Sequence, residues 1–159
     1  MAKSIGPYLR ENWKRFSNKP GGKWIFSRIV GFTVPYTGSI AANVALLEPG
    51  RGQITLKERR KINNHLRSVH AIALANLAEM VTGLTLLNSL PDDTRGILTS
   101  MQIQYHKKAR GLLTAECDCE IPENNEEREL QLSGEIKNES GEVVATATAT
   151  WRIGPEKKA

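Results

Sequence analysis

The chain has 159 residues, of which 40% are apolar and 25% charged, as is typical of one soluble globular domain with a proper core. This composition excludes a wholly disordered chain. The formal net charge of +5 is unevenly distributed: residues 1–30 carry seven Lys or Arg side chains against Glu11 alone, whereas residues 116–142 carry ten acidic and two basic ones. Because so divided a charge does not form a continuous basic stripe, nucleic acid binding is not favoured.

Two cysteines, Cys117 and Cys119, are too few and too close for a disulfide framework or a zinc site. We expect small core side chains in a reducing compartment, with a vicinal redox pair as the alternative. His65, His70 and His106 lack the spacing of metal ligands, so no metal site is expected. The basic N-terminus is not followed by the uninterrupted apolar segment of a secretory signal, and we expect a cytoplasmic protein.

Residues 1–37 are predicted to form a basic helical extension packed on the main domain, residues 38–159. Within the extension, turn chemistry at 18–22 separates two short helical stretches. Each stretch has an apolar stripe, made of Tyr8, Leu9, Trp13 and Phe16 in the first and of Trp24, Ile25, Ile29 and Val30 in the second. Two interpretations remain open: surface helices packed on the domain, or an amphipathic lid that touches an anionic membrane or covers an acyl chain.

The main domain begins with segments that have the alternating pattern of strands. Residues 40–48 and 53–59 predict two antiparallel strands joined by a tight turn at 49–52. Four longer alternating segments follow the next helix and predict an antiparallel sheet with one buried face. Their expected inward rows are Ile97, Thr99, Met101, Ile103 and Tyr105; Leu113, Ala115, Cys117, Cys119 and Ile121; Leu130, Leu132, Gly134 and Ile136; and Val143, Ala145, Ala147, Ala149, Trp151 and Ile153.

Between the two groups of strands, residues 68–90 are almost all apolar or small, and Glu79 is the only carboxylate. A helix that is apolar around its whole circumference belongs in a core, although this run is also about long enough to span a bilayer. Because polar residues such as Asn76 interrupt it, we favour a buried helix. Ser68 is the expected N-cap, and Pro91 cannot continue the helix.

The element order is therefore strand–strand–helix–four strands, an α+β fold in which about six antiparallel strands curve around one long buried helix. The three alanines in the inner row of the last strand leave room for that helix. This order matches the hotdog fold.

One motif adds a functional hypothesis to this fold. The segment 64–72, followed by Leu77-Ala78-Glu79, resembles the hotdog-fold acyl-CoA thioesterases of the phenylacetyl-CoA and 4-hydroxybenzoyl-CoA thioesterase type. Their usual pattern is an Asn, the His of a His-Gly-Gly turn six residues later, and an acidic residue nine positions after that His. Asn64, His70 and Glu79 stand at these intervals, but Ala71-Ile72 replaces the glycines, as in an uncharacterised subgroup of hotdog proteins.

The resemblance implies a catalytic arrangement. Glu79 would activate a water molecule as general base; the less favoured alternative is that Glu79 is itself the nucleophile. Asn64 and the Ala71 backbone N–H at the helix start would polarise the thioester carbonyl. His70 would shape the turn. The implied substrate is an acyl-CoA, so coenzyme A would enter as part of the substrate and no cofactor is needed. The resemblance also implies a homodimer or a dimer of dimers, with the carboxylate facing motif residues of the partner.

The residues around Glu79 suggest further substrate contacts. Thr82 and Gly83 share a helical face with Glu79, and Gly83 could let a ligand approach closely. Met80 could set pocket depth, and Ser68, His70 and Arg67 in the motif loop are the other candidates, with Arg67 suited to phosphate. In the competing interpretation Glu79 only fixes packing, and the chain is a non-catalytic hotdog module that binds acyl-CoA or fatty acid, or a scaffold.

Overall fold

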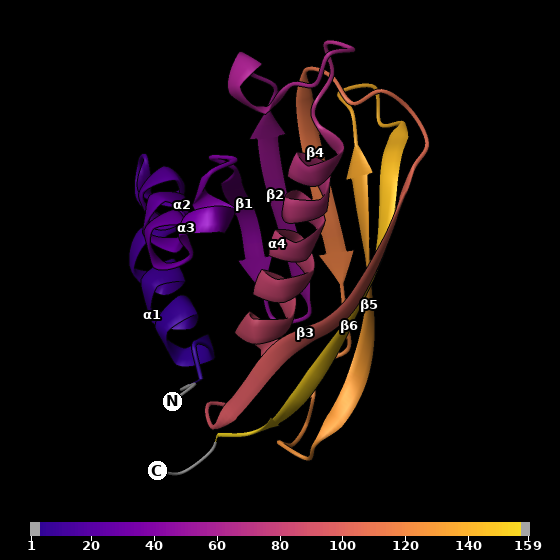
Figure 1. The fold of residues 1–159 in the computed structure, drawn as a ribbon. Helices are drawn as coiled ribbons and strands as arrows, with labels where there is room; N and C mark the ends of the chain where they lie inside the picture. Colours follow the sequence, from indigo (N-terminus) through magenta and orange to yellow (C-terminus); the bar gives the residue numbers. More distant parts are fainter. Residues whose placement is uncertain (1–3, 157–159) are drawn as a thin grey trace.

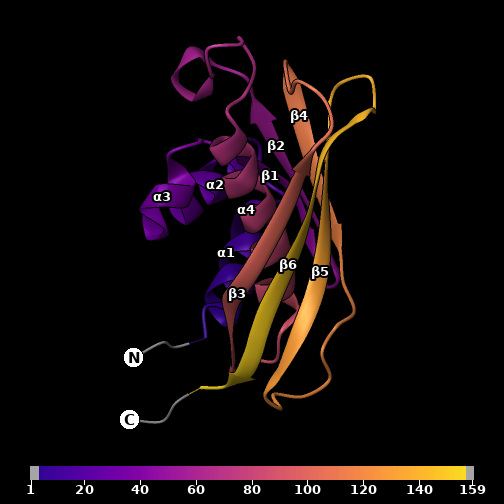
Figure 2. The same cartoon turned by 45° about the vertical axis from the view of Figure 1, so that its right-hand side comes forward.

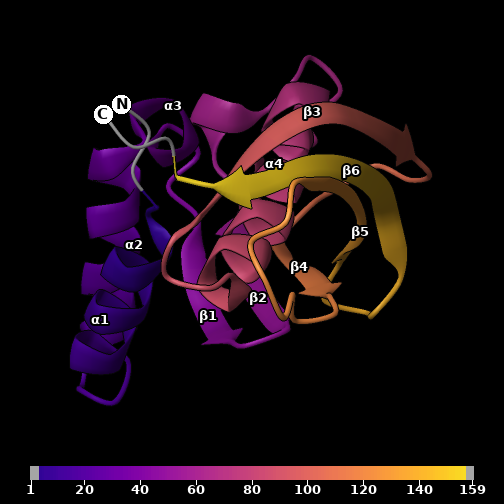
Figure 3. The same cartoon turned by 90° about the horizontal axis from the view of Figure 1, so that it is seen from below.

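A computed structural model describes residues 4–156 of the chain. One long helix, α4 (Ala71–Ser89), lies at its centre, and a six-stranded antiparallel sheet wraps around it (Figure 1). Seen along the helix, the sheet curves from β1 round to β3 (Figure 3). The strands, in their order across the sheet, are β1 (Asn43–Glu48), β2 (Arg51–Lys57), β4 (Leu112–Asp118), β5 (Arg128–Lys137), β6 (Val143–Pro155) and β3 (Thr94–Tyr105). The predicted α+β architecture, a curved antiparallel sheet around one buried helix, is confirmed.

Helix α4 is the one helix within residues 4–156 that is long and apolar enough to cross a membrane, and most of that stretch is buried inside the protein. The preference for a core helix is therefore confirmed. It fits closely against the sheet at Gly83, where an added Cβ would lie 2.9 Å from the Trp151 ring of β6. The inward alanines of β6, such as Ala147, are buried and give the helix its space.

The predicted alternation holds along most of the sheet. In β4, Leu113, Ala115 and Cys117 are buried, whereas the next two residues expected to face inward lie past the end of the strand. Cys119 is half-buried and Ile121 is exposed, so the inward row was predicted too long.

Strand β3 departs from the predicted pattern because the register shifts between Leu98 and Ser100, where one extra residue forms a β-bulge. A bulge reverses which face the residues before it occupy. Leu98 therefore lies opposite Trp151 of β6, while Ile97, expected inside, is 51% exposed. The predicted inward row is correct only beyond the bulge, at the half-buried Met101 and Ile103.

The N-terminal residues form α1 (Gly6–Phe16), α2 (Gly22–Thr33) and the single-turn α3 (Pro35–Gly38), so the two predicted helices are present. They join the core: Phe26 is fully buried, and its ring meets that of Trp13 edge-on at 5.1 Å. Helix α1 also holds the end of α4, because the Arg10 guanidinium donates to the carbonyl oxygens of Asn88 at 2.8 Å and Leu90 at 3.1 Å. The predicted domain boundary at residue 37 stays a prediction.

The alternation on β4 gives a matched pair for testing the core. Leu113→Ala, at a fully buried position, should lower the free energy of unfolding by about 2–5 kcal/mol, because it removes buried methylenes and leaves a cavity. Leu112→Ala, at the adjacent and 40% exposed position, should cost less than about 1 kcal/mol. Urea denaturation followed by circular dichroism measures both, and similar costs for the two variants would contradict this register.

Candidate functional site

The motif loop between the turn of 3-10 helix at Arg60–Ile62 and α4 is held together by Asn64. Its side-chain Oδ1 accepts from the N–H of Leu66 at 2.9 Å and of Ser68 at 3.3 Å, and from the Ser68 hydroxyl at 3.2 Å. Because two backbone N–H groups point at this oxygen, the amide orientation is fixed. The Asn64 Nδ2 has no hydrogen-bond partner within residues 4–156, so one strong donor of this side chain is left for a ligand.

Helix α4 is capped by His70 and not by Ser68 as predicted. His70 has extended backbone angles (φ −64°, ψ 141°), and its Nδ1 accepts from the Ile72 N–H at 3.1 Å. Ser68 is buried and uses its hydroxyl on the Asn64 loop instead. An accepting Nδ1 places the ring proton on Nε2, which fits a residue that shapes the turn and does not act as a base.

The cap leaves free donors at the helix start. The first four N–H groups of a helix have no partner inside the helix. Here His70 takes those of Ile72 and Leu74, so the N–H groups of Ala71 and Ala73 remain without a partner among the described residues. The Ala71 carbonyl accepts from the Tyr105 hydroxyl of β3 at 3.0 Å, which fixes the helix start against the end of that strand.

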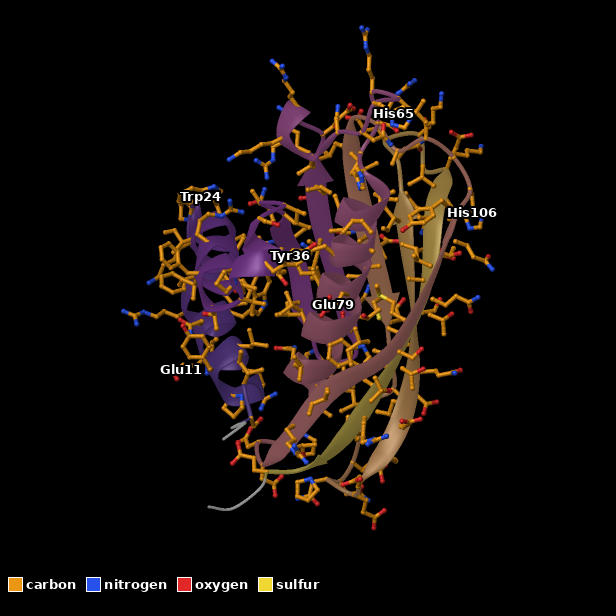
Figure 4. The ribbon with its side chains drawn as sticks, in the orientation of Figure 1. Glu11, Trp24, Tyr36, His65, Glu79 and His106 are labelled. Carbon is orange, nitrogen blue, oxygen red and sulfur yellow. The ribbon has the colours of Figure 1, made fainter. Side chains whose placement is uncertain are left out.

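Glu79 lies halfway along α4 (Figure 4). Its side chain is half-buried, not enclosed as predicted, and within residues 4–156 no hydrogen bond or ion pair holds its carboxylate. The two neighbours that could donate to the Glu79 carboxylate make other hydrogen bonds. The Asn76 Nδ2 donates to the Tyr36 carbonyl at 3.1 Å, and the Thr82 hydroxyl donates to the Ala78 carbonyl at 2.9 Å. A packing role through these two partners is therefore not supported.

The motif residues and the carboxylate do not meet within one chain. Glu79 lies eight positions after Ala71, which places the two about 12 Å apart along the helix axis. Asn64 lies in the loop before the helix start, next in sequence to His65, which Figure 4 places well beyond the N-terminal end of α4. A site that uses both Asn64 and Glu79 therefore needs groups from two copies of the chain.

Three of the predicted substrate contacts have other environments. Thr82 is fully buried, and the space beside Gly83 is taken by the Trp151 ring, so within one chain neither residue borders open space; their contact with substrate stays a prediction. Arg67 is exposed in a left-handed backbone conformation (φ +52°), with its carbonyl held by the Arg110 guanidinium at 2.9 Å. Its side chain remains available to an anionic group.

Met80, another predicted contact, lines a pocket. This pocket has a volume of about 490 Å³ and lies between α2, α3, the start of β1 and α4. The sequence did not indicate it, because residues 31–42 have no periodic pattern, and because β1 begins at Asn43, later than predicted. Ala41, with φ +52°, separates α3 from that strand.

The two cysteines lie outside this region. Burial raises the pKa of the Cys117 thiol to about 12, with the neighbouring Cys119 adding to the shift, and burial also raises the pKa of Cys119. Thiols with raised pKa values are poor nucleophiles at neutral pH. The burial of the two thiols and their raised pKa values thus favour core side chains over a redox pair.

Solved structures resemble the chain over most of its length. A crystal structure from a genomics programme is 27% identical, with a TM-score of 0.80, over 94% of this chain and 99% of that one. A Pseudomonas aeruginosa protein described as a probable thioesterase is 22% identical (TM-score 0.74; 82% and 93% of the two chains). A hypothetical thioesterase from Streptococcus pneumoniae, solved with coenzyme A, is 18% identical (TM-score 0.64; 87% and 100%).

These likenesses establish the class: the chain has the hotdog fold of thioesterase family proteins. It belongs to the family described as a domain of unknown function, DUF4442, whose model matches residues 22–153. The match includes α2 and α3, so these helices are part of what the family shares. No curated protein matches the chain significantly.

Proposed function

We propose that the protein hydrolyses the thioester bond of an acyl-CoA. The observation that carries the proposal is the Glu79 carboxylate, which is half-buried on α4 and held by no other described side chain. Unpartnered donors at Ala71 and Asn64 supply the complementary half of such a site. The coenzyme A bound by the structurally similar S. pneumoniae protein supports this class of substrate.

In the proposed reaction, Glu79 removes a proton from a water molecule, whose oxygen attacks the thioester carbonyl carbon. Negative charge then develops on the carbonyl oxygen, which the Ala71 N–H and the Asn64 Nδ2 stabilise with help from the helix dipole. The carbon–sulfur bond breaks, and the coenzyme A thiolate takes up a proton to leave as the thiol. The products are a carboxylic acid and free coenzyme A.

The active species is proposed to be a homodimer, because Asn64 and Glu79 of one chain lie too far apart to share a substrate carbonyl. Strand β3 forms an edge of the sheet and runs alongside α4 (Figure 2). It carries exposed apolar side chains, among them Ile97 and Tyr105, and an unpaired apolar edge is a pairing surface. A second copy docked along β3 would bring its own motif loop towards Glu79.

The dimer proposal is tested with two matched isoleucines. Ile97→Lys, on β3, should convert the dimer to monomer and reduce turnover, because a charge would be buried in the contact. Ile121→Lys, at a similarly exposed site away from β3, should leave both unchanged. Size-exclusion chromatography with light scattering gives the mass, and a monomeric wild-type protein with full turnover would refute the shared site.

Replacing the base tests the chemistry directly. Glu79→Gln keeps the size of the side chain but cannot accept the proton, so kcat for acyl-CoA hydrolysis should fall about 100-fold or more. Glu120→Gln removes an exposed carboxylate outside the site and should be silent. Free thiol release across short, medium and long acyl-CoAs provides the measurement. Unchanged turnover in Glu79→Gln would remove Glu79 from the mechanism.

The acceptor role of the Asn64 Oδ1 and the donor role of its Nδ2 can be tested separately. Asn64→Asp keeps an acceptor for the Leu66 and Ser68 N–H groups but loses the Nδ2 donor. The melting temperature should therefore stay close to wild type while kcat falls about 100-fold, as expected for the loss of one oxyanion donor. If Asn64→Asp retains wild-type kcat, Asn64 only holds the loop.

A second function, binding of acyl-CoA or fatty acid without catalysis, is favoured by one feature. Ile72 is 55% exposed at the start of α4, where the thioesterases that the motif resembles have glycine. A side chain there narrows the approach to the Ala71 N–H. Such a binder would show the same rise in melting temperature with acyl-CoA in the wild type and in Glu79→Gln. It would release no free thiol.

A further inference from the structure

The pocket between the N-terminal helices and α4 has no role in the mechanism above. Its volume of about 490 Å³ is within the range of small-molecule sites, and its walls are mostly apolar. Met80 contributes from α4, Phe32 and Pro35 from the helical extension, and Ala42 from the residue before β1. Such a lining suits a hydrocarbon ligand.

The pocket is built by a tight corner. Where α2 and α3 cross, Gly31 and Gly38 are in backbone contact: a Cβ on Gly38 would lie 2.4 Å from the Gly31 carbonyl oxygen. This crossing therefore needs glycine, and the small side chains of Ser27, Ala41 and Ala42 leave the adjoining space empty. The pocket is open because the residues that line it on α2 and before β1 are small.

One wall is fixed by a charged residue. Arg28 reaches from α2 to the start of β1, where its guanidinium donates to the Ala42 carbonyl at 2.8 Å and to the Asn43 side chain at 3.1 Å. Its outer face stacks over the Trp24 ring, 5.8 Å from the centroid. These contacts hold α2 at a fixed distance from β1, so the pocket exists before a ligand arrives and binding costs little reorganisation.

Phe32 stands at the rim. It is 90% exposed, and it borders both this pocket and a second apolar hollow formed by Trp24, Ile25 and Ile29. So exposed a ring contributes little to folding, whereas contact with an apolar ligand at the pocket mouth would remove it from water.

The pocket also adjoins the proposed catalytic helix face. Met80 directly follows Glu79, and the Asn76 Nδ2 joins α4 to the Tyr36 carbonyl of α3 one turn earlier. We infer that this pocket holds the acyl chain of the thioester, so that the protein prefers aliphatic chains of medium length over acetyl. The inference rests on the proposed function for the identity of the ligand, but chain binding itself needs no catalysis.

A ligand that cannot be hydrolysed tests chain binding independently of catalysis. S-octyl-coenzyme A, a thioether, and free coenzyme A are titrated by calorimetry into the wild-type protein. S-octyl-coenzyme A should bind about tenfold or more tightly than free coenzyme A, because several methylenes leave water. Phe32→Ala should weaken binding of the octyl ligand about fivefold, since part of that apolar contact is lost. Thr37→Phe, which fills the pocket from α3, should abolish the octyl advantage.

Free coenzyme A should bind equally to all these proteins. Tyr8→Ala is the control, because Tyr8 is an exposed ring on α1 that does not line this pocket. Melting curves verify that Thr37→Phe is folded, and Phe32→Ala carries the test if it is not. A tenfold octyl advantage without any turnover of octanoyl-CoA would support the pocket while the thioesterase proposal fails.

Three results would overturn the inference. The first is equal affinity for the octyl ligand and free coenzyme A in the wild-type protein. The second is an octyl affinity unchanged in both pocket variants. The third is co-sedimentation with anionic phospholipid vesicles that Phe32→Ala abolishes, without any dependence of ligand binding on chain length. That outcome would assign Phe32 and the basic extension to a membrane surface, as the sequence alone also allowed.

Discussion

The structure depends on the enclosure of α4. Because this helix has no polar stripe, nearly every position must be covered by another element. The curved sheet covers most of it, and the fit is close where Gly83 meets Trp151 and where the inner alanines of β6 approach. Helix α1 covers part of the remainder. The curvature of the sheet, the placement of small residues and the need for an N-terminal extension all follow from one apolar helix.

Against this background, the polar groups that remain free are informative. A half-buried carboxylate without a partner costs solvation free energy, and so do helix N–H groups left without an acceptor. The Glu79 carboxylate and the Ala71 N–H meet these descriptions within residues 4–156. A protein can retain such groups where another molecule completes their interactions. In the proposed function, that molecule is an acyl thioester held between two subunits.

The fold was predictable because alternation and all-round apolarity are local patterns that tertiary contacts reinforce. The failures have local causes as well. A single bulge at Leu98–Ser100 exchanged the faces of Ile97 and Leu98, and alternation does not reveal an extra residue. Ser68 and His70 can both cap a helix, and the Asn64 loop decided between them. The pocket beside Met80 depends on a crossing of two glycines far from any periodic segment.

The contact between Arg10 and the end of α4 has a consequence for how the chain folds. Helix α4 ends without a glycine cap or a basic residue in its last turn, and the Asn88 carbonyl in that turn accepts from a residue 78 positions earlier, Arg10. A contact of such sequence separation forms late, because the loop it closes is long. The last turn of the core helix should thus order fully only when α1 docks against it. The docking of α1 and the completion of α4 are therefore coupled through one side chain, Arg10.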